Sequence, residues 1–341
     1  MKEFEIINNL IRPLANNQSS QNLDDDVAVI DLKTLVEEKQ SLVISKDMLI
    51  ENVHFRIQDG AKSIAHKMLA VNLSDLAATG AVPLFYLFGF GKSNNISSQF
   101  LKEFFESLSQ LQNKYNCQLI GGDIVKSNKL TLSVTIIGKV NNGANLKTNN
   151  AKCGDDIWVS GEIGNSYLGL QIINSRLKKD REIVENSIKL DTKSQLLIES
   201  YLYPQPQIKL GSILANNNLA NAATDISDGL LADLAKIANK SRLTAKIFLE
   251  KIPHCQEFIA NITNSKKKYQ KLITKIIAGG DDYQLIFTAS KAKEEEINSI
   301  AKKNNIKLTK IGSFTKWQGR ELEIIDWEQK PIIINKYGYQ H

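Results

Sequence analysis

The chain has 341 residues, 42% of them hydrophobic and 23% charged, which is typical of a folded globular protein with a complete core. This length favours about two domains, and no apolar run is long enough to span a bilayer, which argues against a membrane-spanning helix. The net charge is +6, but the strongest basic run, Lys266–Lys268 with Lys271 and Lys275, contains only one aromatic residue and indicates a solvated helix face rather than a nucleic-acid surface.

The cysteines and the N-terminus bear on the cellular compartment. Cys117, Cys153 and Cys255 are far apart, lack metal-ligand spacing and are odd in number, which argues against a disulfide framework. The first residues include Glu3 and Glu5 and lack the apolar core of a signal peptide. We therefore expect a cytoplasmic protein.

The N-terminal half is predicted to mix helices and strands. Apolar residues from Phe4 to Leu14 recur at helical spacing and predict an amphipathic helix. Further helices are expected over 64–78 and 100–111, and strands over 41–45, 83–90, 118–120 and 130–136. The strand at 118–120 is expected to stop at Gly121-Gly122.

Residues 141–150 are rich in Asn and Gly and form the best candidate for a linker. Beyond them, strands are expected over 156–160, 220–226, 245–249, 283–289 and 306–311, and helices over 166–173, 191–202, 208–214, 230–238 and 292–302. Strands and helices alternate without a regular βαβ rhythm, so the sequence predicts two α+β domains, at 1–140 and 151–341.

Acidic clusters stand at the ends of several apolar segments. They are Asp24-Asp25-Asp26, Ser45-Lys46-Asp47, Asn72-Leu73-Ser74-Asp75, Gly121-Gly122-Asp123, Asp225-Ile226-Ser227-Asp228-Gly229 and Gly279-Gly280-Asp281-Asp282. Carboxylates that converge on one place repel each other unless cations neutralise them. Hard oxygen ligands suit Mg²⁺, which is commonly held by a few carboxylates together with substrate phosphates. The sequence therefore favours an enzyme that uses Mg²⁺ and a nucleotide.

Each motif alone is weaker evidence of function than all of the motifs together. Asp225 and Asp228 are close enough in sequence to face one metal, yet Ser and Asp are also favoured helix caps, so this segment alone fits either function. Gly91-Lys92-Ser93 matches the end of a P-loop, but Tyr86 stands where that motif needs its first glycine. A strand that runs into a polar turn is the better interpretation there.

Together the motifs resemble the thiamine-monophosphate kinases, in the superfamily of aminoimidazole ribonucleotide synthetase and selenide water dikinase. The resemblance extends over nearly the whole chain. It is carried by Asp25–Val29, Glu51–Phe55, Lys67–Ala78, Gly121–Asp123, Asp225–Leu230 and Gly280–Leu285. The runs around Asp75 and Asp225–Leu230 are specific in combination, and the histidine of Val53-His54-Phe55 separates this family from its cousins.

The resemblance implies a two-domain α+β fold of the aminoimidazole ribonucleotide synthetase type. An N-terminal mixed sheet with helices (1–140) would bind ATP and Mg²⁺ and form a homodimer, and a C-terminal α+β domain (151–341) would complete the active site. The implied reaction is ATP-dependent phosphorylation of thiamine monophosphate to thiamine diphosphate, with no nucleic-acid or membrane partner.

The resemblance also implies roles for individual residues. It assigns metal binding to Asp26, Ser45, Asp47, Asp75, Asp123, Asp225 and Asp228. It assigns ATP contacts to Phe105, Gly122, Asp123, Lys147, Thr148 and Ser227, and thiamine phosphate contacts to His54, Asp281 and Tyr339. No general base is expected, because the acceptor is a phosphate monoester whose oxygens are largely ionised at pH 7.

The chain departs from the family pattern at several of these positions. Lys46 replaces a hydroxyl residue, and Thr148 stands where the pattern has a phosphate-binding arginine, with Lys147 as the neighbouring cation. Asp281 replaces a glutamate and Asn150 a glycine. Two alternatives therefore stay open: a superfamily kinase or synthetase with another acceptor, and a nucleotide-binding protein that has lost catalysis.

Overall fold

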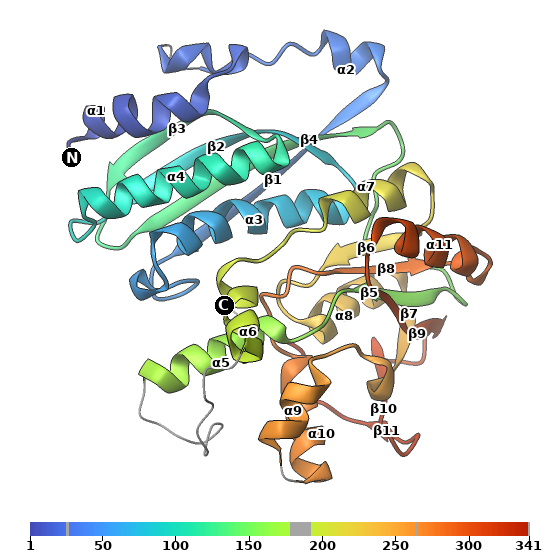
Figure 1. Cartoon of the computed structure of the whole chain (residues 1–341). Helices are drawn as coiled ribbons and strands as arrows, with labels where there is room; N and C mark the ends of the chain where they lie inside the picture. Colours follow the sequence, from blue (N-terminus) through green and yellow to red (C-terminus); the bar gives the residue numbers. More distant parts are fainter. Residues whose placement is uncertain (25–26, 178–191, 264, 340–341) are drawn as a thin grey trace. The chain divides into compact units, whose positions relative to one another are not determined.

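The computed structural model describes residues 1–24, 27–177, 192–263 and 265–339. The chain divides into two compact units, unit 1 from Met1 to Asn145 and unit 2 from Leu146 to His341. Each unit combines helices with a mixed sheet (Figure 1), which confirms the predicted α+β class. No helix within the described ranges combines the length and the apolar character needed to cross a membrane.

Unit 1 is built on a four-stranded sheet in the order β1-β4-β2-β3. The strands are β1 (Gln40–Ile50), β2 (Val82–Lys92), β3 (Gln118–Lys126) and β4 (Thr131–Asn141). The helices are α1 (Glu3–Ile6), α2 (Lys33–Glu37), α3 (Ala61–Thr79) and α4 (Ser98–Tyr115), with short π and 3₁₀ turns over 7–23 and 57–59. β2 and β3 are parallel, and the other two pairs are antiparallel.

The register of the four strands defines two faces of this sheet. Directly paired residues share a face, and successive residues of a strand alternate between faces. Phe88 and Phe90 of β2 pack on Phe104 and Phe105 of α4, so their face is the inner one. The opposite, outer face contains the row Met48, Ser133, Gly89 and Asp123.

Unit 2 contains a seven-stranded sheet in the order β11-β10-β7-β9-β5-β8-β6. Its strands are β5 (Asp156–Ser160), β6 (Ala222–Asp225), β7 (Leu243–Phe248), β8 (Leu285–Ala289), β9 (Leu308–Lys316), β10 (Leu322–Ile325) and β11 (Pro331–Ile332). Its helices are α5 (Asn165–Leu177), α6 (Thr192–Leu202), α7 (Ile208–Asn216), α8 (Leu230–Ser241), α9 (Gln256–Ile262), α10 (Lys266–Ile276) and α11 (Glu294–Asn304).

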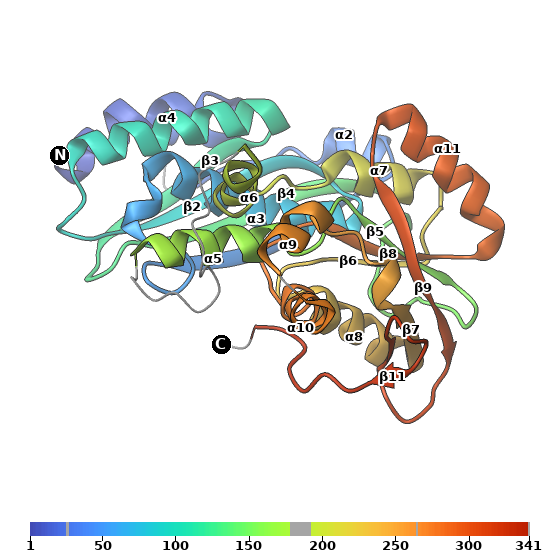
Figure 2. The ribbon, with the colours of Figure 1, turned by 60° about the horizontal axis from the view of Figure 1, so that its bottom comes forward.

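The central strands of this sheet explain why helices lie on both of its sides. Ile157 and Val159 of β5 belong to the same buried cluster as Leu231 and Leu234 of α8. Trp158 points the other way, where the Lys310 ammonium lies over its ring. The same ammonium contacts Glu294 of α11 at 2.7 Å, and Figure 2 shows α8 and α11 on opposite sides of the sheet.

Most predicted elements agree with the structure, and two do not. The strand expected to stop at Gly121-Gly122 continues to Lys126, because β3 stays paired with β2 up to Lys92. The single N-terminal helix is instead a succession of α, π and 3₁₀ turns over 3–15, with Pro13 in the last of them. The strand expected over 83–90 is confirmed; it continues through Gly91 and Lys92, and a turn at 94–95 follows it.

Candidate functional site

In unit 1, an edge strand and a helix bring three predicted metal ligands together. Ser45 and Asp47 lie on the inner face of β1, which α3 covers. The Ser45 hydroxyl donates to Oδ2 of Asp75 at 2.5 Å, and the backbone N–H of Asp47 donates to Oδ1 of Asn72 at 3.1 Å. Because side chains alternate along β1, the oxygen atoms of Ser45 and Asp47 both face α3, which carries Asp75.

Burial and the neighbouring Asp47 charge both disfavour the ionised form of Asp75. Burial raises the pKa of Asp75 to about 6, the Ser45 hydrogen bond lowers it, and the charge of Asp47 raises it further. A nearby cation would relieve both unfavourable effects. Two carboxylates and a hydroxyl are hard oxygen donors, and so this set fits Mg²⁺.

Gly122 and Asp123 lie at the other edge of the sheet, on β3. Asp123 pairs with Gly89, whose other neighbour is Ser133 of β4, so Asp123 belongs to the outer face. Asp47 belongs to the inner face, and β4 and β2 separate its strand from β3. Within unit 1 the structure therefore does not bring Asp123 to the cluster of Ser45, Asp47 and Asp75.

A cavity of about 670 Å³ lies on the outer face, under the N-terminal segment. Its lining includes Arg12, Val27, Lys46, Gly122, Asp123 and Ser133. The Lys46 ammonium donates to the Ser133 hydroxyl at 2.7 Å. Lys46 thus lies on the face opposite Asp47, so within one chain its charge does not stand between Asp47 and a metal.

Two other predicted residues of unit 1 are held by local structure. Phe105 is 2% exposed and packs against Phe88, Phe90 and Phe104, which places its ring in the core. His54 follows β1, and its Nδ1 accepts the backbone N–H of Ile50 at 3.0 Å. This hydrogen bond selects the neutral tautomer that carries hydrogen on Nε2.

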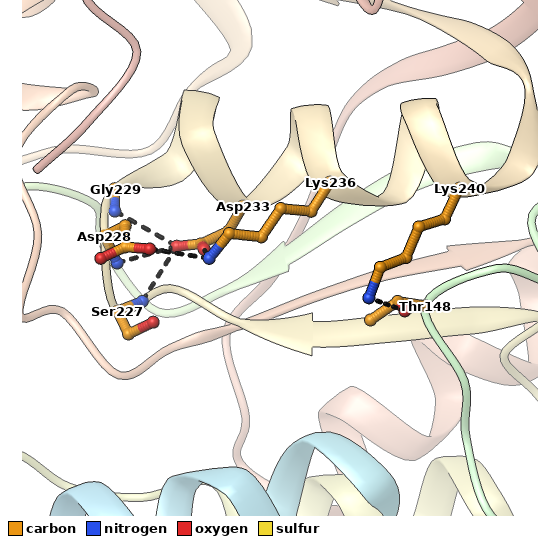
Figure 3. A network of polar contacts seen from close by, with 7 residues as sticks. All are labelled: Thr148, Ser227, Asp228, Gly229, Asp233, Lys236 and Lys240. Atoms are coloured by element: carbon orange, nitrogen blue, oxygen red, sulfur yellow. Dashed lines mark hydrogen bonds and ion pairs between the residues drawn. The ribbon is translucent and has the colours of Figure 1, made fainter. Parts of the chain in front are cut away.

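In unit 2, the end of β6 and the loop that leads to α8 contain three predicted residues, and the loop is folded around a further acid, Asp233. Asp225 ends β6 and is buried. Oδ2 of Asp233, in the first turn of α8, accepts the backbone N–H groups of Ser227, Asp228 and Gly229 at 3.0, 3.0 and 3.2 Å (Figure 3). These bonds fix the positions of Ser227 and Asp228 relative to the end of β6.

Lys236 connects the two carboxylates of this loop. Its ammonium lies 2.7 Å from both Asp228 and Asp233 (Figure 3). Burial lowers the pKa of Lys236, but the two carboxylates outweigh that effect and hold the pKa well above its usual range. Asp228 is thus paired with a protein cation, whereas sequence reasoning expected it beside a metal.

Asp281 and Tyr339 both form backbone hydrogen bonds with this loop. The N–H of Asp281 donates to the Ser227 carbonyl at 2.9 Å, and the N–H of Tyr339 donates to the Asp228 carbonyl at 3.0 Å. A side chain on Gly280 would clash with the Ser227 carbonyl, so only glycine permits this approach. The structure therefore brings Ser227, Asp228, Asp281 and Tyr339 together.

The backbone of the Asp281 segment is strained. Asp281 and Tyr283 have φ angles of 69° and 49°, a left-handed conformation that is uncommon for residues other than glycine. The Tyr283 hydroxyl donates to Oδ1 of Asp281 at 3.0 Å and helps to hold this arrangement. Strain of this kind persists only where the surrounding structure enforces it, and it is concentrated at functional sites.

The neighbouring Asp282 has a structural role. Its carboxyl group is buried and accepts the backbone N–H groups of Gly164 and Ser166 at 2.7 and 3.3 Å, at the start of α5. Burial raises its pKa to about 7, the two N–H groups lower it, and the Asp281 charge raises it again.

We expect Asp282 to make unit 2 less stable as the pH rises. The folded pKa of about 7 exceeds the unfolded value of 3.8, so the stability that this group contributes is complete below pH 4 and is lost as the pH rises through 7. Asp282→Asn should flatten the fall of the unfolding free energy between pH 5 and pH 8 by on the order of 1–2 kcal/mol. Chemical denaturation of both proteins across this range is the measurement, and equal slopes would refute the expectation.

Several residues of the site region were not predicted, namely Asp233, Lys236 and Lys240. The last of these donates from Nζ to the Thr148 hydroxyl at 3.1 Å (Figure 3). An acid in the first turn of a helix with a lysine three residues later is a recognisable pairing pattern, and it could have indicated Asp233 and Lys236. Asp25 and Asp26 lie outside the described residues, and the described ones contain no group of three or more His, Cys, Asp or Glu able to hold a metal.

The chain matches two family models. Residues 24–140 match the AIR synthase related protein N-terminal domain, and residues 153–325 match the AIR synthase related protein C-terminal domain. The thiamine-monophosphate kinase of Buchnera aphidicola subsp. Schizaphis graminum is 35% identical over 99% of this chain and 98% of its own length. The chain belongs to the thiamine-monophosphate kinase family.

Solved structures of this family agree with the fold. The thiamine-monophosphate kinase of Stenotrophomonas maltophilia K279a has a TM-score of 0.80 at 30% identity, covering 95% of this chain and 96% of that one. AaThiL complexed with AMPPCP and TMP has a TM-score of 0.72 at 25% identity, covering 99% and 97%. The predicted two-domain fold of the aminoimidazole ribonucleotide synthetase type is thereby confirmed.

Proposed function

We propose that this chain transfers the γ-phosphoryl group of ATP to the phosphate of thiamine monophosphate, giving thiamine diphosphate and ADP. The observation that carries the proposal is the similarity to a thiamine-monophosphate kinase over 99% of the chain. A relative that was solved with AMPPCP and TMP supports both the nucleotide and the acceptor. The clusters around Asp75 and Asp228 supply the acidic residues that such a reaction needs.

The chemistry requires positioning more than proton transfer. An oxygen of the acceptor phosphate attacks the γ-phosphorus, the bond from this phosphorus to the β,γ-bridging oxygen breaks, and ADP leaves with the electron pair. We propose that Asp26, Ser45, Asp47, Asp75, Asp123, Asp225 and Asp228 hold Mg²⁺. When bound, Mg²⁺ would neutralise phosphate charge and keep two anionic reactants from repelling each other.

We assign binding roles to the remaining predicted residues. His54, with hydrogen on Nε2, is suited to donate to the acceptor phosphate. Asp281 and Tyr339 are held against the Ser227–Asp228 backbone, and a carboxylate there suits the cationic thiazolium ring of the acceptor. For ATP we retain Gly122, Asp123, Lys147, Thr148 and Ser227, with residues 1–140 binding ATP and Mg²⁺ and residues 151–341 completing the site. Phe105 is left out, because its ring is buried in the core of unit 1.

We also propose a homodimer formed through unit 1. β1 and β3 are the edge strands of its sheet, and unpaired edges favour association with another copy. Ile44, Met48 and Val125 lie on the outer face and are 62%, 49% and 54% exposed. Light scattering at micromolar concentration should give twice the monomer mass, and Ile44→Lys with Met48→Lys should lower it; a monomeric unmodified chain would refute the dimer.

The decisive experiment incubates the purified chain with Mg²⁺, ATP and thiamine monophosphate and measures thiamine diphosphate and ADP together. Equal amounts of both products are expected, with no ADP when the acceptor is omitted. If ADP forms only with an acceptor other than thiamine monophosphate, the chain is a different kinase or synthetase of the superfamily. Tight ATP binding without turnover would identify a nucleotide-binding protein and reject the proposed reaction.

A further inference from the structure

The segment that carries Thr148 lies beside β6, the strand that leads to the loop of Ser227 and Asp228. The backbone carbonyl of Lys147 accepts the N–H of Ala223 in β6 at 3.2 Å, so residues 147–148 run along the strand that leads to Asp225. Lys240, in the last turn of α8, donates from its ammonium to the Thr148 hydroxyl at 3.1 Å. Figure 3 shows Lys236 and Lys240 extending from successive turns of α8 toward these two segments.

The two lysines differ in how their charge is balanced. The Lys236 ammonium is neutralised by Asp228 and Asp233, each at 2.7 Å. Lys240 is exposed, its partner is a neutral hydroxyl, and it forms no ion pair with a carboxylate in the part of the chain that the structure describes. Its positive charge is therefore available to an anion that comes to Thr148.

We propose that Lys240 binds a phosphate group of the nucleotide and supplies the charge that the family pattern places at position 148. This inference rests on the proposed function. It places the compensating charge on Lys240 instead of on Lys147, the neighbouring cation in the sequence, whose backbone carbonyl bonds Ala223. An ammonium is a compact point charge, so it can replace the charge of an arginine without its two-pronged geometry.

The proposal changes what an arginine at position 148 would do. Thr148→Arg would place a second cation next to the Lys240 ammonium, and like charges at such short range oppose each other. Restoring the arginine alone should therefore improve nucleotide binding little. Thr148→Arg combined with Lys240→Ala should bind nucleotide better than Lys240→Ala does.

The test measures the binding of AMPPNP, in the presence of Mg²⁺, by titration calorimetry. Lys240→Ala should weaken binding by roughly tenfold, the scale of one hydrogen bond to a charged group, and Lys240→Arg should restore most of the loss. The matched control is Lys275→Ala, another exposed lysine in the last turn of a helix of unit 2. Adenosine, which has no phosphate, should bind the Lys240→Ala variant and the unmodified chain equally.

The outcomes separate this inference from the function on which it rests. If the unmodified chain and Lys240→Ala bind AMPPNP equally, Lys240 does not contact the nucleotide and the inference fails while the proposed function stands. If Lys275→Ala weakens AMPPNP binding as much as Lys240→Ala does, the loss reflects the net charge of the protein and the inference also fails. If the unmodified chain binds no AMPPNP, the proposed function fails and this inference fails with it. Lys240→Gln provides a second variant should the alanine protein not fold.

Discussion

Asp75→Asn is expected to lower kcat/KM by about a thousandfold while unit 1 stays folded. Loss of a metal ligand removes several kcal/mol of charge stabilisation in the transition state, and each 1.36 kcal/mol is a factor of ten. Asparagine has nearly the same size as aspartate, and its carbonyl oxygen can still accept the Ser45 hydrogen bond. Steady-state kinetics at limiting and saturating Mg²⁺ is the measurement.

The stability of the same variant provides an independent readout. In the metal-free protein the pKa of Asp75 is about 6 instead of 3.8, so its contribution to stability is lost as the pH rises through 6. At pH 8 and without metal, Asp75→Asn should be more stable than the unmodified chain by on the order of 2 kcal/mol. Asp31→Asn, which changes an exposed carboxylate of the same unit, should alter neither quantity. Near-normal activity of Asp75→Asn at limiting Mg²⁺ would show that Asp75 binds no metal.

The cluster at Asp75 could be foreseen because its causes are local. Strand alternation puts Ser45 and Asp47 on one face of β1, and α3 needs only its own sequence to present Asn72 and Asp75 on successive turns. The resemblance named these residues, and the structure shows Ser45 bonded to Asp75. The metal itself stays a prediction.

The placement of Asp123 and Lys46 depends on information that no short segment contains. Their faces follow from the register of four strands, in which a shift of one residue would move every side chain to the other face. The sequence predicts a strand end at Gly121-Gly122 because glycine commonly marks turns. In the structure Gly122 instead lies against the Phe88 carbonyl, where no larger residue fits, and the strand continues.

The acids of the β6–α8 loop show a different limit, because their contacts are local but depend on the backbone conformation of the loop. Sequence reasoning identified Asp225 and Asp228 and missed Asp233, whose carboxylate holds the loop. From the sequence, Asp233 is one more polar residue in the first turn of an amphipathic helix. Its role depends on the bend at Ser227 and Asp228 and on the positive φ of Gly229, 129°, which together direct three backbone N–H groups at one oxygen.

Asp228→Asn is therefore expected to lose activity but keep its stability, whereas Asp233→Asn is expected to lose stability. The Asp228 side chain is 32% exposed, and exposed ion pairs contribute about 0–1 kcal/mol, so its loss should change the unfolding free energy by less than about 1 kcal/mol. If Asp228 binds Mg²⁺ as proposed, turnover should fall by at least about a hundredfold, because charge stabilisation in the transition state is lost. The loop should keep its shape, since Asp233 still holds its amides and Lys236 still has one carboxylate partner.

Asp233→Asn removes a carboxylate that is 1% exposed and replaces one of its oxygens with an amide donor. Lys236 would lose its buried partner, and some of the three backbone N–H groups would lose their acceptor, at a cost of about 2–4 kcal/mol in unfolding free energy. Thermal unfolding and MgATP kinetics of both variants separate the roles. Asp228→Asn should melt like the unmodified chain and be inactive, whereas Asp233→Asn should melt roughly 5–10 °C lower. Equal melting temperatures for the two variants would mean that Asp233 does not hold the loop, and an active Asp228→Asn would remove Asp228 from the metal site.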